Sequence, residues 1–170
     1  MSFIPEYRFC PVCGGRLEER LLKHGEPKRL VCTECDFVFY IDPKVAVIAV
    51  VPLEGGLVLV RRSINPGYGL WVAPGGFVDV GEPVEEAVVR ETLEETRLTV
   101  EVSRLINIYS YRGRQTVVLA YLTRYLSGDL AAGDETLEAR IFGLDEVPWD
   151  ELAFSSTRQA VAEYLQSLKR

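Results

Sequence analysis

Three glutamates in the middle of the chain, Glu91, Glu94 and Glu95, have a spacing that could hold a metal ion. On a helix that turns by 100° per residue, their carboxylates share an arc of about 100° on one face. Glu91 has like-charged neighbours at i+3 and i+4, which cost stability unless a cation lies among them. Carboxylate oxygens are ligands that Mg2+ and Mn2+ prefer. The spacing therefore predicts a divalent-metal site.

A divalent ion that keeps open coordination positions binds phosphate oxygens and activates a water for attack. The predicted chemistry is thus cleavage of a phosphate or diphosphate linkage. The alternative is an exposed glutamate-rich helix stabilised by i,i+4 ion pairs, for which Glu86 and Arg90 have the favourable order.

A second set of candidate ligands lies near the start of the chain, where four cysteines form two C-x2-C pairs, namely Cys10 with Cys13 and Cys32 with Cys35. Two such turns supply the four tetrahedral ligands of a closed Zn2+ site, which holds shape and does no chemistry. Iron in a similar site, two disulfides and inert buried thiols are the alternatives. His24 is the only histidine and is expected on the surface, so a histidine mechanism has little support.

A loop and a helix must position the glutamates. Pro74-Gly75-Gly76 predicts a turn with close backbone approach, and the helix is expected from Pro83 to about Thr96. Val84, Ala87 and Val88 form an apolar stripe that the carboxylates continue, and Val89 and Leu93 form a second stripe on the opposite side. We therefore expect the helix to be buried from two directions.

The remaining pattern favours an α/β fold in which helices flank a mixed sheet. A second helix is expected from Thr157 to about Leu168, capped by Ser155 or Ser156. Strands are predicted over residues 36–40, 45–51, 57–60, 98–102, 106–111, 116–126 and 139–142.

Composition bounds the organisation and the partners. A chain of 170 residues with 48% hydrophobic residues allows one full core and a small appendage. We place the cysteine-containing appendage at residues 1–40 and the main domain at residues 41–170. The net charge of −6 argues against long nucleic acid and anionic membranes as partners. The start of the chain lacks the layout of a signal peptide and no stretch could span a membrane, which predicts a cytoplasmic protein.

The segment around the glutamates resembles the Nudix hydrolase family, whose box is G-x5-E-x7-R-E-U-x-E-E-x-G-U with U an apolar residue. The matching residues are Gly76, Glu82, Arg90, Glu91, Glu94, Glu95 and Leu98. Thr92 replaces an apolar residue and Arg97 replaces the last glycine. We expect Arg97 to end the helix without the left-handed turn that glycine allows.

The resemblance implies an α/β/α sandwich preceded by a zinc ribbon, and Mg2+- or Mn2+-dependent hydrolysis of a nucleoside diphosphate derivative. It implies that Arg90 orients a glutamate and that Glu82 supports the loop or a further ion. Acidic residues from a later loop often join such sites, which makes Glu135 a candidate, with Glu138 behind it. The implied metal ligands are Glu91, Glu94, Glu95, the Gly75 carbonyl and Glu135.

The substrate expected from the resemblance is a small nucleotide, with ADP-ribose or FAD favoured. The signature of NADH pyrophosphatases is absent from Ile106–Arg114, which makes NADH less favoured, and the ADP-ribose proline and the coenzyme A signature are also missing. Arg62 and Arg112 are the candidates for the diphosphate, and Trp71 for a ring of the substrate. A catalytically silent nucleotide sensor or a zinc-ribbon interaction module is the alternative function, and a homodimer is left open.

Overall fold

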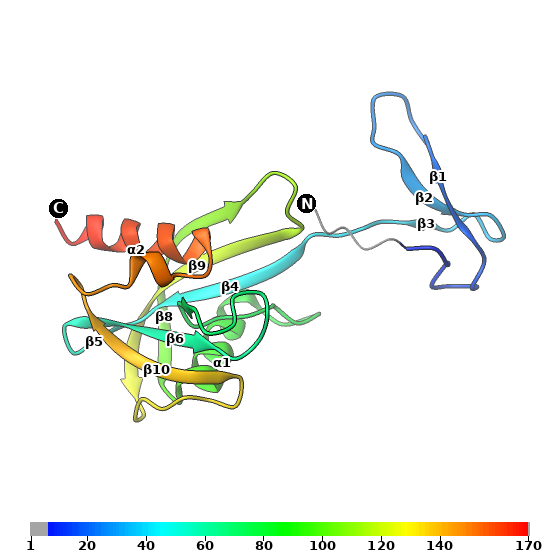
Figure 1. The fold of residues 1–170 in the computed structure, drawn as a ribbon. Helices are drawn as coiled ribbons and strands as arrows, with labels where there is room; N and C mark the ends of the chain where they lie inside the picture. Colours follow the sequence, from blue (N-terminus) through cyan, green and yellow to red (C-terminus); the bar gives the residue numbers. More distant parts are fainter. Residues whose placement is uncertain (1–6, 170) are drawn as a thin grey trace. The chain divides into compact units, whose positions relative to one another are not determined.

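The computed structural model describes residues 7–169 and divides into two compact units (Figure 1). The smaller unit comprises the chain up to Pro43 together with residues 113–115, and the larger comprises Lys44–Arg112 and the chain from Thr116 onward. Residues 1–6, on which part of the signal-peptide prediction rests, and residue 170 lie outside the described range.

The small unit is a three-stranded antiparallel sheet in the order β1-β2-β3. Its core contains the buried side chains of Cys10, Leu17 and Cys32. The predicted strand over residues 36–40 shortens to β3, because Asp36 has a positive φ of 56° and turns the chain. The strands are β1 (Leu17–Arg20), β2 (Arg29–Cys32) and β3 (Val38–Phe39).

The large unit contains two sheets, one of which has both parallel and antiparallel strand pairs. β4 lies parallel to β9, and β8 pairs with β9 antiparallel, in the order β4-β9-β8. The second group has the order β10-β6-β5, with β7 also on β6, and all its pairs are antiparallel. The strands are β4 (Lys44–Val50), β5 (Pro52–Leu53), β6 (Gly56–Arg62), β7 (Trp71–Val72), β8 (Thr99–Ser110), β9 (Thr116–Ser127) and β10 (Thr136–Gly143).

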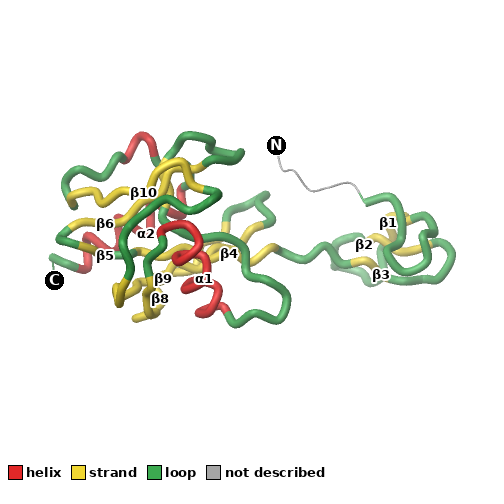
Figure 2. Tube along the Cα trace, turned by 90° about the horizontal axis from the view of Figure 1, so that it is seen from below, coloured by secondary structure: helices red, strands yellow, loops and turns green. Residues whose placement is uncertain are grey.

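Alternation along the central strands produces the predicted α/β/α sandwich. In β4, Val47 and Ala49 belong to one hydrophobic cluster and Ile48 and Val50 to the other, since successive strand side chains point to opposite faces. Helix α1 (Val84–Thr96) contributes to the first cluster and α2 (Ser155–Ser167) to the second. Figure 2 shows both helices against the strands, where α1 packs on β4, β8 and β10 and α2 on β4, β8 and β9.

The predicted second apolar face of α1 is only partly buried, since Val89 packs against the core. Leu93, on the predicted second face, is 43% exposed. Thr92 is fully buried at its apolar position, and its hydroxyl donates to the Val88 carbonyl at 2.7 Å. That hydrogen bond removes the cost of burying a hydroxyl, which explains why threonine is tolerated there.

The end of α1 also corrects a prediction. Arg97 adopts the left-handed conformation, with φ 62° and ψ 10°, and its N–H donates to the Leu93 carbonyl at 2.9 Å. The turn that glycine makes in the family box is therefore preserved without glycine. Leu98, the next residue, is fully buried, so tertiary packing holds the chain in this turn against the preference of Arg97.

Two further boundaries differ from the sequence prediction. The predicted strands 98–102 and 106–111 form the single strand β8, and two of the three register shifts in its pairing with β9 fall at or next to the predicted break. Helix α2 has Phe154 as its N-cap, without a side-chain hydrogen bond, so neither Ser155 nor Ser156 caps it. A short 3-10 helix, η1 (Trp149–Glu151), precedes it. Among residues 7–169 no helix is long and apolar enough to cross a membrane.

We predict that Arg97→Gly stabilises the protein. The substitution removes the cost of a left-handed arginine, about 1 kcal/mol, and loses only the exposed ion pair between Arg97 and Asp134, worth about 0.5 kcal/mol or less. The free energy of unfolding in urea should rise by about 0.5 kcal/mol. Arg97→Ala, which keeps the positive φ, is the control and should give no gain. A lower urea midpoint for Arg97→Gly would contradict this account.

Candidate functional site

The Pro74-Gly75-Gly76 turn is fixed to strand β4 by main-chain hydrogen bonds. Val47 N–H donates to the Gly76 carbonyl and Ala49 N–H donates to the Pro74 carbonyl, both at 2.8 Å. Gly75 has φ 153°, and a Cβ there would overlap the Val47 carbonyl. A side chain is therefore excluded at this position by the close approach of β4.

The same turn lies against the carboxylates of α1. A Cβ built on Gly76 would lie 2.5 Å from the carboxylate oxygens of Glu91. The N–H of Gly75 donates to Oε2 of Glu95 at 2.9 Å. Both glycines thus let the backbone reach two of the predicted metal ligands directly.

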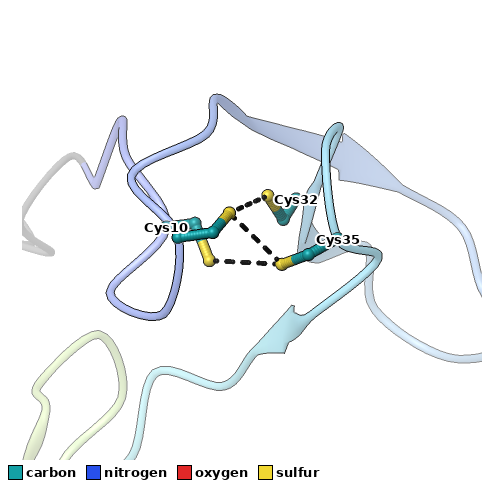
Figure 3. Close-up of side chains that lie close together, drawn as sticks. Cys10, Cys32 and Cys35 are labelled. Carbon is teal, nitrogen blue, oxygen red and sulfur yellow. Dashed lines mark hydrogen bonds between the residues drawn. The ribbon is translucent and has the colours of Figure 1, made fainter.

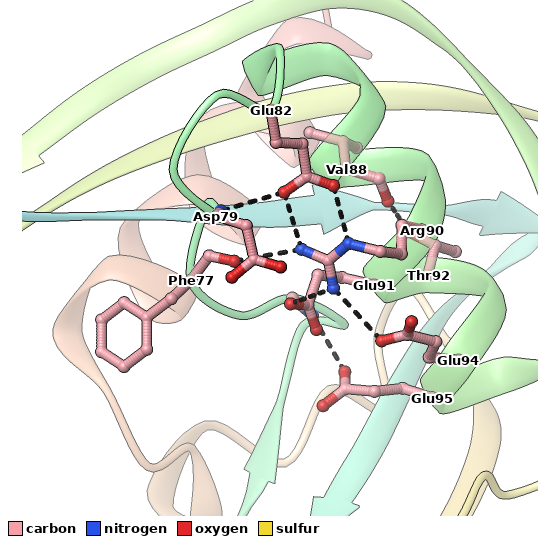
Figure 4. A network of polar contacts seen from close by, with 10 residues as sticks. Phe77, Asp79, Glu82, Val88, Arg90, Glu91, Thr92, Glu94 and Glu95 are labelled. Carbon is pink, nitrogen blue, oxygen red and sulfur yellow. Dashed lines mark hydrogen bonds and ion pairs between the residues drawn. The ribbon is translucent and has the colours of Figure 1, made fainter.

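Arg90 gathers the acidic side chains of the loop and the helix (Figure 4). Its Nε donates to Glu82 Oε1 at 2.7 Å, and one terminal nitrogen donates to Glu91 at 2.8 Å and to Glu94 at 3.2 Å. The other terminal nitrogen donates to Glu82 Oε2 at 2.9 Å and to the Phe77 carbonyl at 3.1 Å. The rigid guanidinium fork therefore sets the relative positions of three carboxylates.

Glu82 is part of this support. Its hydrogen bonds from Arg90, together with the N–H of Asp79 at 3.0 Å, lower its pKa to about 2. The same contact raises the pKa of the Arg90 guanidinium. Glu82 is consequently a fixed anion that ties the loop to α1.

Glu91 and Glu95 are in a different electrostatic state. Burial raises the pKa of Glu95 to about 7, although the Gly75 N–H and the charge of Arg62 act in the opposite direction. Burial also raises the pKa of Glu91, against the opposing effect of Arg90. Two desolvated carboxyl groups that repel each other suit a divalent cation, whose charge would favour the ionised form of both.

The other predicted ligands lie around this pair. Glu94 is the most exposed of the three glutamates, with 58% of its side chain accessible. Glu135 lies close enough for its charge to raise the pKa of Glu95, and its carbonyl accepts a hydrogen bond from the Ser63 hydroxyl at 2.6 Å. Gly133 lets this loop pack on α1, because a Cβ there would overlap the Glu94 carbonyl.

The three predicted substrate residues have different surroundings. Arg62 stacks on Phe154, 5.0 Å from the ring centroid, and its charge favours the ionised form of Glu95. Trp71 is only 5% exposed and packs edge-on against Phe142, so its place in the core leaves almost none of its ring for a substrate. Arg112 lies exposed in the turn between β8 and β9 and makes no ion pair with the glutamates.

The four cysteines of the small unit converge (Figure 3). All four sulfur atoms lie within 4.8 Å of one another, and the thiols are free. Backbone N–H groups of Val12, Gly15 and Glu34 point to three of the sulfur atoms at 3.4 Å. Within residues 7–169 only the cysteines form such a close group of possible metal ligands.

Some contacts of the site carry no sequence signal. The Phe77 carbonyl and the Asp79 N–H act through the backbone, and their side chains play no part in it. Phe154 is separated from Arg62 by more than 90 positions, and no motif marks the pair. Only the box positions could be found from spacing.

Comparison with known protein families fits this geometry. The sequence model of the NUDIX domain matches residues 42–164, and the model of the Nudix N-terminal zinc ribbon matches residues 8–41. The chain belongs to the Nudix hydrolase family. This Nudix chain is 33% identical over 157 residues to an ADP-ribose pyrophosphatase of Methanocaldococcus jannaschii, covering 90% of this chain and 87% of that one.

Other relatives extend the likeness. A NUDIX hydrolase from Nitrosomonas europaea has a solved structure that superposes with a TM-score of 0.89 at 32% identity, covering 95% of this Nudix chain and 92% of the other. A solved ADP-ribose pyrophosphatase from Streptococcus suis gives 0.64 at 30% identity, covering 75% and 93%. The NAD-capped RNA hydrolase NudC of Vibrio cholerae is 30% identical over 83% of this chain, which spans about half of NudC.

We predict that Glu82→Gln weakens the large unit in a pH-dependent way. The folded-state pKa of Glu82 is about 2, below the ordinary 4.5, so its carboxylate stabilises the fold above pH 4.5 and loses this effect as pH falls toward 2. The stability difference between wild type and variant should therefore shrink over that range. Urea unfolding followed by fluorescence of Trp71 and Trp149 measures it.

The control is Glu86→Gln, an exposed glutamate in the first turn of α1, which should show a small difference. A difference between wild type and Glu82→Gln that stays constant from pH 7 to pH 3 would contradict the role of the Arg90 ion pair.

Proposed function

We propose that the protein hydrolyses the diphosphate linkage of a small nucleoside diphosphate derivative, in a reaction that needs Mg2+ or Mn2+. The observation that carries the proposal is the pair of half-buried carboxylates, Glu91 and Glu95, held against the Gly75-Gly76 turn and beside Arg90. ADP-ribose is the favoured substrate, because relatives at 33% and 30% identity are named ADP-ribose pyrophosphatases. FAD is second and NADH third.

The residues that would hold the cation are Glu91, Glu94 and Glu95 on α1, the Gly75 carbonyl and Glu135. When bound there, such an ion neutralises phosphate oxygens and lowers the pKa of a water. The chain's own contribution is orientation: Arg90 fixes Glu91, and the Gly75 N–H fixes one oxygen of Glu95. Glu82 keeps Arg90 in place from the loop.

On the substrate side, Arg62 is the residue we assign to the diphosphate. Its guanidinium lies near the carboxylates, as its effect on Glu95 indicates, and guanidinium forks match phosphate oxygens. The buried position of Trp71 argues against a stacking role, and the exposed position of Arg112 gives it no contact with the cluster.

The alternatives have less support. A catalytically silent nucleotide sensor does not need all three carboxylates, whereas Glu91, Glu94 and Glu95 are all present. A long nucleic acid is not favoured, because the net charge is −6 and the chain spans about half of the NAD-capped RNA hydrolases that it resembles. The small unit would bind Zn2+ through its four converging thiols and hold its shape, and it need not take part in the reaction.

The test of the proposed function is Mg2+-dependent release of AMP from ADP-ribose, with FAD and NADH as competing substrates. Glu95→Gln should reduce kcat at least about 100-fold, because it removes a ligand and a charge from the site. Glu86→Gln, an exposed glutamate in the first turn of α1, is the matched control and should retain the wild-type rate. Unchanged turnover by Glu95→Gln, or AMP release without a divalent ion, would refute the proposal.

For the small unit, metal analysis of the purified protein should give about one zinc per chain, as four thiolate ligands require. Cys32→Ser, which removes a buried ligand, should lose the metal. Replacement by Co2+ should give the absorption bands of a tetrahedral sulfur site. A wild-type protein that is folded and free of metal would contradict the structural role.

A further inference from the structure

Arg62 is held between two segments that are distant in sequence. We propose that Phe154, the N-cap residue of α2, is a positioning residue that fixes the Arg62 guanidinium to receive the diphosphate of the substrate. The proposal rests on the proposed function, because it assumes that Arg62 contacts the diphosphate. It assigns to the start of α2 a part in substrate binding that the box residues alone would not suggest.

Two contacts define the orientation of Arg62. Its Nε donates to the Pro66 carbonyl at 2.8 Å, and its guanidinium carbon lies 5.0 Å from the centroid of the Phe154 ring. Neither contact uses the terminal nitrogens, which have no hydrogen-bond acceptor within the described part of the chain. The planar group is thus held by its Nε and by one face, and its terminal donors remain for a ligand.

The segments on either side of Arg62 are in close contact with each other and with β7. A Cβ on Gly67 would lie 3.0 Å from Ala153 and 3.5 Å from the Arg62 Cδ, so the 66–67 turn and the segment before α2 are in close contact. Ala153 N–H donates to the Trp71 carbonyl at 2.9 Å, and Leu152 forms a parallel bridge with Trp71. Main-chain bonds to β7 therefore set where the Phe154 ring lies.

Arg62 is also close to acidic residues of the site. Strand pairing places Thr136 opposite Arg62, so Arg62 is next to the segment that follows Glu135. The charges of Arg62 and Glu135 both act on Glu95. A diphosphate bound at the predicted metal site could therefore also accept hydrogen bonds from the Arg62 guanidinium at its edge.

The neighbouring arginine, Arg61, has a similar pair of contacts, since its guanidinium carbon lies 5.9 Å from the centroid of the Trp71 ring. Arg61 points to the opposite face of β6, as strand alternation requires. Its Nε donates to the Gly69 carbonyl at 2.8 Å, and one terminal nitrogen lies 3.9 Å from Glu138. Arg61 is consequently the matched control, because it has a similar backbone carbonyl partner and a similar aromatic contact but lies on the other face of β6.

Phe154 should matter because a free arginine loses considerable side-chain entropy when it binds phosphate. A ring face attracts the guanidinium and restricts it before the substrate arrives. The expected effect is therefore on substrate binding: Phe154→Leu should raise KM about three- to tenfold, with kcat within about twofold of wild type. Phe154→Tyr, which keeps the ring, should behave as wild type.

The decisive experiment is a double-mutant cycle with Phe154→Leu and Arg62→Ala, with Arg61→Ala as control. The readouts are KM for ADP-ribose and, independently of turnover, the Kd for an ADP-ribose analogue with carbon in place of the bridging diphosphate oxygen. If Phe154 acts through Arg62, Phe154→Leu should change neither value further once Arg62 is alanine. Arg61→Ala should leave both values as in wild type.

Two outcomes would overturn the inference. One is an equal effect of Phe154→Leu with and without Arg62, which would mean that the ring contacts the substrate or only supports α2. The other is an unchanged KM and Kd in Phe154→Leu. If that variant does not fold, Phe154→Met, which fills a similar volume, replaces it in the cycle. A wild-type protein that hydrolyses no nucleotide would instead defeat the proposed function, so the two failures are distinguishable.

Discussion

The structure of the site depends on one side chain, Arg90. Its guanidinium holds Glu82 from the loop and Glu91 and Glu94 from α1, and it also donates a hydrogen bond to the Phe77 carbonyl. Without a cation at this place, three carboxylates would repel one another and the loop would have no fixed distance from the helix. Arg90 thus converts a cluster of like charges into an ordered set of ligands.

The order extends outward from that ion-pair network through backbone contacts. Strand β4 holds the Gly75-Gly76 turn, and the turn holds Glu95 by an N–H and approaches Glu91 without a side chain between them. Burial raises the pKa of both carboxyl groups, because the positive charges of the protein do not fully compensate them. The site is therefore suited to an added cation. Arg62, oriented by contacts from another part of the chain, adds positive charge at the edge.

Much of this could be predicted from the sequence, because some constraints are local. The helix from residue 84 to 96 follows from its spacing, and the family box identifies Arg90 and the glutamates. The two cysteine pairs predict convergence, and the sulfur atoms do converge. Errors occurred where a tertiary contact outweighed a local preference: Arg97 takes a left-handed turn that its type disfavours, and Leu93 is exposed although its neighbours suggested a buried face.

The sequence by itself determined the family, the sandwich of helices and sheet, and the acidic and thiol groups available for metal binding, since residue type and periodicity are properties of the chain. Only the tertiary structure decided which groups meet. Trp71 belongs to the core, and Arg62 lies against Phe154, a residue more than 90 positions away. Such pairings depend on how β6, β7 and α2 pack, and no local pattern encodes them, because a contact between distant segments is fixed by the whole fold.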